Sequence, residues 1–589
     1  MIQPATGAFR SVASPMLASV SRRLESRPMK PFALHSRLLV RLACALLAGG
    51  LFLVCGAQAA DLPQLRRQGT ATQLIVDGQP FLLRGGEVSN SHGEPDYLRS
   101  SWAKFKALNL NALIVPVYWN VIEPTEGKFD FATVDGLITD ARANDLRLVL
   151  LWFGSWKNSM SCYVPEWVKT DAVRFPRARD SAGHALEILT PFAAASSAAD
   201  ARAFAALMRH LREFDGSRHT VVLVQVENEI GMIPEARDRH AAADAAFAGP
   251  VPEGLMTYLA AQRDALAPEM RDRWLSRGAR SAGTWTEVFG EGAASSELFM
   301  AWHFGRYVEQ VAAAGRAEYA LPLYVNAALI RPGYQPGQYP SAGPLPHLID
   351  VWRAAAPTVD FISPDIYFPN FAEWADRYVR GGNPLFIPEA LRNPDAAVNS
   401  LYAFGAGNGI GFGAFGIEAI AELAAGLLAA SNDLVRQLTP LIVTHQGAGT
   451  MTALLAPAAE QRRPQELNFG GLTLGVTYER LESPGLADGV INEAGDRPAT
   501  RTQLPAGAIV IQLAPHEFLF GGIGVTVTFA APTPGDPIVG ILTCEEGRFV
   551  DGKWQHIRWL NGDQTHQGRH LRLEPGRFTL QRVKLYRYR

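Results

Sequence analysis

A run of apolar, mostly β-branched residues at positions 221–226 constrains the fold of this chain more than any other stretch. Glu227, Asn228 and Glu229 follow it directly, and Gly231 comes two residues later. Such a run predicts a strand buried on both faces, as in a parallel sheet covered by helices. Polar side chains at the C-terminal end of a buried strand are costly unless they have a role, and catalytic residues of parallel α/β barrels lie at that end. The alternative is a solvated strand end with two carboxylates in water.

Seven further apolar runs are separated by helical patterns. They are the second arm of a hairpin over residues 73–84, then residues 112–119, 146–153, 321–326, 359–367, 384–389 and 409–416. The helical patterns include apolar residues at i, i+3, i+4 and i+7 between residues 204 and 211. This alternation predicts the α/β class and a (β/α)₈ TIM barrel over residues 61–445, enlarged by a helical insert at residues 232–294.

The pattern changes after residue 445. Residues 525–529 alternate between apolar and polar, and Gly, Pro and Asp-Gly interrupt short apolar runs. Period-2 alternation with frequent turn signals is typical of antiparallel sheets. Residues 446–589 are therefore predicted to form a C-terminal, all-β, sandwich-like domain.

The first 60 residues have the features of a targeting segment. Basic residues precede an apolar run at 42–54, and Ala57-Gln58-Ala59 forms a small-x-small site that predicts cleavage before Ala60. The run is too short for a stable membrane span. Met29 is a candidate true start within residues 1–60. We expect a periplasmic or secreted protein.

Composition and cysteine usage limit the classes of partner. The net charge of −2, with 19% charged residues, gives no basic face for nucleic acid. No His/Cys cluster has metal-ligand spacing, so neither a metal nor another cofactor is expected. Cleavage would leave only Cys162 and Cys544, and the sequence leaves their pairing open.

Two glutamates end apolar runs that the barrel would bring to one rim. Glu229 follows the run at 221–226, and Glu389 ends the run at 384–389, directly after Pro388. Two carboxylates across a barrel mouth are what glycoside hydrolysis requires, one to protonate the leaving oxygen and one to attack the anomeric carbon. The alternative for Glu389 is an ordinary loop carboxylate.

Three stretches resemble motifs of glycoside hydrolase family 35, the β-galactosidases. Residues 224–231 are similar to its acid/base motif, residues 115–131 to its second-strand signature, and residues 385–390 to its nucleophile strand. The whole chain resembles a bacterial subgroup active on galactosylated plant polysaccharides such as xyloglucan. The resemblance implies a retaining exo-β-galactosidase acting on terminal β-D-galactosyl residues, with Glu229 as acid/base and Glu389 as nucleophile.

Six further residues are predicted to contact the substrate or support the site. Asn228 is expected to bond the hydroxyl next to the reacting carbon, and Tyr118 matches a tyrosine that contacts the sugar in the family. Tyr367 is expected either to donate to the nucleophile or to be a core tyrosine. The other three are a stacking candidate and two polar strand-end residues: Trp156, Asn158 and Glu87.

Two departures from the family keep other functions open. Residues 154–158 stand where many members carry an Ala-Glu pair that binds galactose hydroxyls, and the usual Gly-Trp is absent after Glu389. One alternative is another retaining β-glycosidase, acting on β-glucosides or α-L-arabinopyranosides. The other is a non-catalytic carbohydrate-binding protein.

Overall fold

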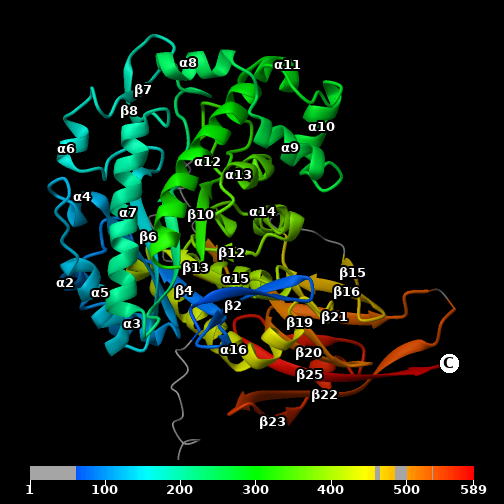
Figure 1. Ribbon diagram of the computed structural model, residues 1–589. Helices are drawn as coiled ribbons and strands as arrows, with labels where there is room; N and C mark the ends of the chain where they lie inside the picture. The colour runs from blue at the N-terminus through cyan, green and yellow to red at the C-terminus, as the bar shows by residue number, and fades with distance from the viewer. Residues whose placement is uncertain (1–60, 458–463, 485–500, 534) are drawn as a thin grey trace, which may run out of the picture. The chain divides into compact units, whose positions relative to one another are not determined.

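Eight parallel strands form the central sheet of the protein (Figure 1). The computed structural model describes residues 61–457, 464–484, 501–533 and 535–589, so the predicted targeting segment lies outside it. In chain order the strands are β4 (Leu83–Glu87), β5 (Ala112–Tyr118), β6 (Arg147–Lys157), β9 (Val221–Asn228), β10 (Leu323–Ala328), β11 (Phe361–Asp365), β12 (Phe386–Ile387) and β13 (Gly411–Phe415).

The sheet closes on itself. Its order is β11-β10-β9-β6-β5-β4-β13-β12, with parallel pairing between neighbours. The two ends meet through a parallel bridge between Ile366 and Ala390, where the Ile366 amide donates to the Glu389 carbonyl over 2.9 Å. The predicted TIM barrel is therefore confirmed.

Helices alternate with these strands and cover the outside of the barrel. The longer ones are α5 (Ala132–Ala143), α7 (Ala194–Asp215), α12 (Ala293–Glu318), α15 (Ala396–Gly405) and α16 (Glu422–His445). The short helices α13 (Ile349–Ala355) and α14 (Phe371–Tyr378) follow β10 and β11. Helix α7 buries the stripe predicted from its periodicity, including Phe204, Leu207 and Leu211. It lies beside α12 outside β6 and β9 (Figure 1).

Shorter elements lie in the connections. Four helices fall within residues 232–294: α8 (Ala241–Ala248), α9 (Glu253–Ala261), α10 (Pro268–Ser276) and α11 (Trp285–Phe289). The other connections contain α2 (Pro95–Leu98), α3 (Trp102–Ala107), α4 (Trp119–Ile122), α6 (Glu166–Lys169), β7 (Arg177–Arg179) and β8 (Ala185–Leu189). Across the described ranges, no helix is both long enough and apolar enough to cross a membrane.

A small antiparallel sheet covers the N-terminal end of the barrel. It consists of β1 (Gln64–Gln68), β2 (Ala71–Val76) and β3 (Gln79–Pro80). Leu74 and Val76 of β2 share an apolar cluster with residues that begin barrel strands, such as Leu83. The Gln73 amide donates to the Val443 carbonyl over 2.7 Å and to Gln446 Oε1 over 3.0 Å. This sheet thus closes the floor of the barrel and is tied to the end of α16.

Two antiparallel sheets make up the C-terminal region, as the alternation predicted. One has the order β14 (Met451–Leu455), β19 (Gly507–Ala514), β20 (Glu517–Ile523), β25 (Thr579–Tyr588), β22 (Ile538–Val550) and β23 (Lys553–Trp559). The other has the order β15 (Gln465–Phe469), β16 (Leu472–Tyr478), β21 (Val525–Ala530) and β24 (Leu571–Leu573), and β17 (Glu482–Pro484) pairs separately with β18 (Arg501–Gln503). Leu474, Val527, Phe520 and Val583 bring the two larger sheets into one core.

Candidate active site

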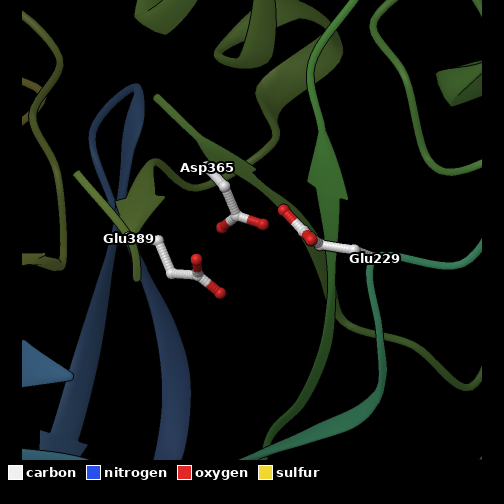
Figure 2. A group of neighbouring side chains, drawn as sticks. All are labelled: Glu229, Asp365 and Glu389. Carbon is white, nitrogen blue, oxygen red and sulfur yellow. The ribbon is translucent and has the colours of Figure 1, made fainter. Parts of the chain in front are cut away.

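Three buried carboxyl groups meet at the C-terminal rim of the barrel. Glu229 directly follows β9, Asp365 ends β11, and Glu389 follows β12. One oxygen of each lies within 4.8 Å of an oxygen of each of the others. Figure 2 shows the three carboxyl groups turned toward one another. The topology therefore brings together two glutamates that are far apart in the sequence, as predicted, and adds an aspartate.

Glu229 is fixed from its backbone and its side chain. Its amide donates to Asn326 Oδ1 over 2.9 Å, and Asn158 donates its amide to Glu229 Oε2. Its φ of 42° lies in the left-handed region, which residues other than glycine rarely adopt. Strained backbone of this kind clusters at functional sites. The carboxylate is thus held in one position with Asn158 beside it.

Glu389 is held by a tyrosine and an asparagine. The Tyr367 hydroxyl donates to Glu389 Oε2 over 2.6 Å, and Asn326 Nδ2 lies 3.5 Å from Glu389 Oε1. The first bond is short because its acceptor is an ionisable carboxylate. Tyr367 is therefore beside Glu389, the residue to which it was expected to donate. Asn326 therefore contacts both glutamates, the backbone amide of Glu229 and the carboxylate of Glu389.

Asp365 lies between the two glutamates. Asn326 Nδ2 donates to Asp365 Oδ2 over 2.7 Å, and Asp365 is 1% exposed. Burial, followed by the negative charges of Glu389 and Glu229, raises the pKa of Asp365 well above its ordinary value. The free protein therefore favours a neutral Asp365, which limits the charge in this crowded group.

Glu87, at the end of β4, approaches Glu389 from another side. Burial, and then the charge of Glu389, raise the pKa of Glu87 well above its ordinary value, and the charge of Lys157 opposes the shift. No donor group in the described part of the chain bonds either Glu87 oxygen. Glu87 therefore favours its neutral form, which limits the negative charge beside Glu389.

Lys157 and Asn228 form a buried pair beside these acids. Lys157 Nζ donates to Asn228 Oδ1 over 2.8 Å and lies 5.1 Å from the centre of the Phe153 ring. Lys157 is only 5% exposed. It ends β6, while Asn228 ends the neighbouring β9. The pair therefore joins the ends of two adjacent strands at the rim.

A second carboxyl pair lies outside the barrel, between β9 and α7. Glu227 Oε2 accepts from the Trp156 amide over 2.7 Å, and Asp200 Oδ2 accepts from the Ser155 amide over 3.1 Å. Burial, and then the charge of Asp200, raise the pKa of Glu227 well above its ordinary value. A side chain at Gly154 would lie 2.6 Å from Glu227 Oε1, so glycine makes room for the pair. The pair holds the strand segment that leads to Lys157 and Asn158.

The position of Trp156 corrects one sequence prediction. The ring was expected to contact substrate, but it packs on Phe304 and Tyr307 of α12 and donates to the Leu189 carbonyl over 3.3 Å. Trp156 is fully buried on the helix side of β6. It supports the strand and cannot stack on a sugar at the rim.

Tyr118 uses its hydroxyl within the protein. The hydroxyl accepts from the Gly93 amide over 2.9 Å and donates to the Asn90 carbonyl over 2.8 Å. The ring stacks on Tyr163, with centroids 5.1 Å apart. Tyr118 therefore holds the loop after β4, and its predicted contact with the sugar is not among these interactions.

Asn326, Asp365 and Lys157 were not predicted as site residues. Asn326 lies near the end of β10 and Asp365 ends β11, so each carries the signal that identified Glu229: a polar side chain after a buried strand. Lys157 lies four residues beyond the predicted end of the run at 146–153, since β6 continues to residue 157. The sequence would have identified Lys157 as a strand-end residue only if the predicted strand had been extended to residue 157.

The three rim carboxylates also form a set of oxygen ligands. Hard divalent cations such as Mg²⁺ and Ca²⁺ prefer carboxylate oxygens. Within the described residues, Glu229, Asp365 and Glu389 are the group whose oxygens lie close enough together to share such an ion. The same three groups fit acid/base and nucleophilic chemistry, so removal of metal ions is a direct test between the two.

Comparisons with known proteins connect these parts of the chain to two families. Residues 73–257 match the model for Glycosyl hydrolases family 35, and residues 428–572 match a Domain of unknown function (DUF5597). The first match includes Glu87, Lys157, Asn228 and Glu229 and ends before Asp365 and Glu389. The family match therefore does not support a role for Glu389; the support comes from the geometry of the rim and from the motif at residues 385–390.

Individual relatives match over short regions. A β-galactosidase of Xanthomonas manihotis is 29% identical over 201 residues, which is 33% of this chain and 31% of that protein. Beta-galactosidase 11 of Arabidopsis thaliana is 38% identical over 61 residues, covering 10% of this chain and 7% of the relative. A crystal structure of a β-galactosidase from the psychrophilic Marinomonas ef1 superimposes with a TM-score of 0.43 at 15% identity, covering 61% of this chain and 60% of that one. The chain thus matches less than a third of the length of either curated relative.

Proposed function

We propose that this chain, whose residues 73–257 match the model for Glycosyl hydrolases family 35, is a retaining β-galactosidase that releases terminal β-D-galactosyl residues. One observation carries the proposal: Glu229 and Glu389 offer carboxylate oxygens within 4.8 Å of each other at the C-terminal rim of the barrel. Retaining glycosidases separate their two carboxyl groups by about 5–5.5 Å, whereas inverting ones leave about 6.5–9.5 Å for a water. Oxygens this close to each other fit the retaining arrangement, in which no water lies between the two carboxyl groups.

In the first step, Glu389 attacks the anomeric carbon as Glu229 protonates the glycosidic oxygen. The bond from that carbon to the leaving oxygen breaks, a covalent bond to the Glu389 carboxylate forms, and the leaving group departs as an alcohol. The Tyr367 hydroxyl holds the Glu389 carboxylate in position through its hydrogen bond to Oε2. Asn158 keeps Glu229 directed toward the reaction centre.

In the second step, Glu229 acts as a base. It takes a proton from a water molecule, whose oxygen attacks the anomeric carbon and displaces Glu389. Each step inverts the anomeric centre, so the product keeps the β-configuration. Asp365 and Glu87 are neutral in this scheme, which leaves the negative charge on Glu389 to stabilise the cationic transition state.

The proposed substrates are galactosylated oligo- or polysaccharides, including xyloglucan side chains. The resemblance of the whole chain to a bacterial subgroup active on such polymers supports this choice. The test incubates the protein with galactosylated xyloglucan oligosaccharides and with aryl β-galactoside, β-glucoside and α-L-arabinopyranoside. Galactose released first as the β-anomer, followed by NMR, is the expected result. Release of α-galactose, or cleavage of another glycoside with no action on galactosides, would contradict the proposal.

We also propose that the protein is exported and that its mature form begins near Ala60. Support comes from the order of the basic segment, the apolar run and the Ala-x-Ala site. N-terminal sequencing of protein recovered from the periplasm or medium tests this. Recovery of a cytoplasmic protein that still carries residues 30–50 would overturn it.

A further inference from the structure

The hydrogen bond between Lys157 and Asn228 determines which end of the Asn228 amide faces the lysine. An ammonium group has three donors and no acceptor, so the Asn228 atom that faces Lys157 Nζ at 2.8 Å must be the carbonyl oxygen. The other end of the amide, Nδ2, therefore points away from the lysine. Asn228 Nδ2 is buried and has no acceptor in the described part of the chain. It is the group in this pair that still needs a partner.

Leaving a buried amide donor without an acceptor is unfavourable. Asn228 directly precedes Glu229 in the chain, so this donor lies next to the proposed acid/base. Without the lysine the amide could rotate by half a turn and present its oxygen instead, because the two ends have nearly the same shape. Lys157 prevents this exchange. Its buried side chain cannot swing into solvent, because its ammonium lies against the Phe153 ring as well as Asn228.

We propose that Lys157 is a positioning residue that orients the Asn228 amide, so that the site offers a donor and selects substrates with an acceptor oxygen at carbon 2. This inference rests on the proposed glycosidase function and deepens it. A hydrogen bond to the 2-hydroxyl strengthens in the transition state of glycoside hydrolysis. An Asn228 amide that presents its oxygen instead of Nδ2 loses this transition-state hydrogen bond, while binding of the rest of the sugar stays intact.

The test compares p-nitrophenyl β-D-galactoside with its 2-deoxy analogue. The ratio of their kcat/KM values is measured for the wild-type protein and for Lys157→Met, which keeps the apolar stem and removes the ammonium. Loss of the 2-hydroxyl changes the intrinsic reactivity of the sugar equally for both proteins, so this change cancels. We expect the preference for the 2-hydroxyl substrate to fall by at least about tenfold in Lys157→Met. An equal loss of activity on both substrates would overturn the inference, because that is the result of a purely structural role.

Two further variants keep the result interpretable. Lys104→Met is the matched control, because Lys104 Nζ donates to the Glu418 carbonyl over 2.8 Å and does not touch Asn228. Its substrate ratio should match that of the wild type. Asn228→Asp keeps a partner for Lys157 but replaces the free donor by an acceptor, so its ratio should fall even if Lys157→Met does not fold. A wild-type ratio in Asn228→Asp would overturn the inference.

Failure of the proposed function gives a different result. If the wild-type protein cleaves no β-galactoside, the activity assignment is wrong. The ratio is then measured on the aryl β-glycoside that the wild type does cleave and on its 2-deoxy form, since carbon 2 is common to these sugars. A fall in the ratio in Lys157→Met on that pair would still support the role of Lys157.

Discussion

The Tyr367 hydroxyl lies 2.6 Å from Glu389 Oε2 and donates a hydrogen bond to it. Tyr367 follows β11, and Glu389 follows β12, so the bond crosses the point where the two ends of the sheet meet. Closure of the barrel and orientation of the proposed nucleophile therefore depend on the same junction.

Tyr367→Phe should lower kcat/KM for aryl galactosides by about 10- to 100-fold. A hydrogen bond to a charged group contributes about 1.5–3 kcal/mol, and its loss leaves Glu389 less well oriented. Tyr402→Phe is the matched control, because the Tyr402 hydroxyl also donates to a carboxylate, Asp376, over 2.8 Å but away from the rim. Steady-state kinetics on both variants check this. Equal activity in the two would show that Tyr367 has no role in the reaction.

Substitution of the two glutamates should have different consequences. Glu389→Ala removes the covalent acceptor, so substrates with good and poor leaving groups should both stall. Glu229→Ala removes proton donation, which a nitrophenolate hardly needs and a sugar alcohol does. Its first step should survive on activated galactosides, and added azide should then give β-galactosyl azide. Product analysis by NMR checks this. An α-azide from Glu229→Ala, or a fast first step in Glu389→Ala, would mean that the roles are reversed.

Asp365→Asn should retain kcat/KM within about tenfold of the wild type, whereas Asp365→Ala should lose more. Burial and the neighbouring glutamates favour the neutral form of Asp365, and asparagine has the shape and the charge of that form. Asparagine can also still accept from Asn326, while alanine leaves the Asn326 donor without this acceptor. Kinetics at neutral pH distinguish the variants. Inactivity of Asp365→Asn in a folded protein would show that the ionised form is needed.

Stability should fall as the pH rises above about 4.5, and Glu227→Gln should reduce that fall. The pKa of Glu227 is raised from its ordinary value of 4.5 by burial and by Asp200, so the folded state holds a proton that the unfolded state releases. This stabilisation is complete below the unfolded pKa and is lost as the pH passes the folded one. Glutamine reproduces the protonated form, whereas Glu227→Ala should lower stability by about 1–3 kcal/mol because the Trp156 amide loses its acceptor. Thermal unfolding at several pH values checks the slope, and an unchanged slope in Glu227→Gln would contradict the raised pKa of Glu227.

Chelation should leave turnover unchanged. The proposed mechanism uses a carboxylic acid and a carboxylate, and no step requires a cation. Activity is measured before and after treatment with EDTA, and again after Mg²⁺, Ca²⁺ or Mn²⁺ is added back. If activity disappears and one ion restores it, the oxygens of Glu229, Asp365 and Glu389 hold a metal, and the mechanism must be revised.

The sequence was informative where buried strands end in polar residues. Eight apolar runs were enough to predict the barrel, and two of them placed Glu229 and Glu389 on one rim. Asp365 and Asn326 carry the same signal, but a single sequence does not tell which strand ends point inward. That depends on the register of each strand in the closed sheet.

The strand after residue 146 explains the misplacement of Trp156. The predicted apolar run covers residues 146–153, so Trp156 and Lys157 lie beyond it at the end of the strand. In the structure, β6 continues to Lys157, so its side chains keep alternating between the two faces of the sheet. Trp156 then faces the helices with Trp152, and Lys157 faces the barrel interior with Phe153. The carboxyl pair that extends this strand includes Asp200 of α7, a contact that local periodicity cannot reveal.

The small sheet of β1, β2 and β3 forms some of its contacts late in folding. Gln73, near the start of the described chain, bonds Val443 and Gln446, which lie 370 and 373 residues further on. A ribosome must therefore synthesise the whole barrel before Gln73 can form these two hydrogen bonds. Contacts so distant in sequence form slowly, since a long loop must close before they stabilise anything. The emerging chain consequently keeps the Gln73 amide without its native acceptors until synthesis has passed the end of α16.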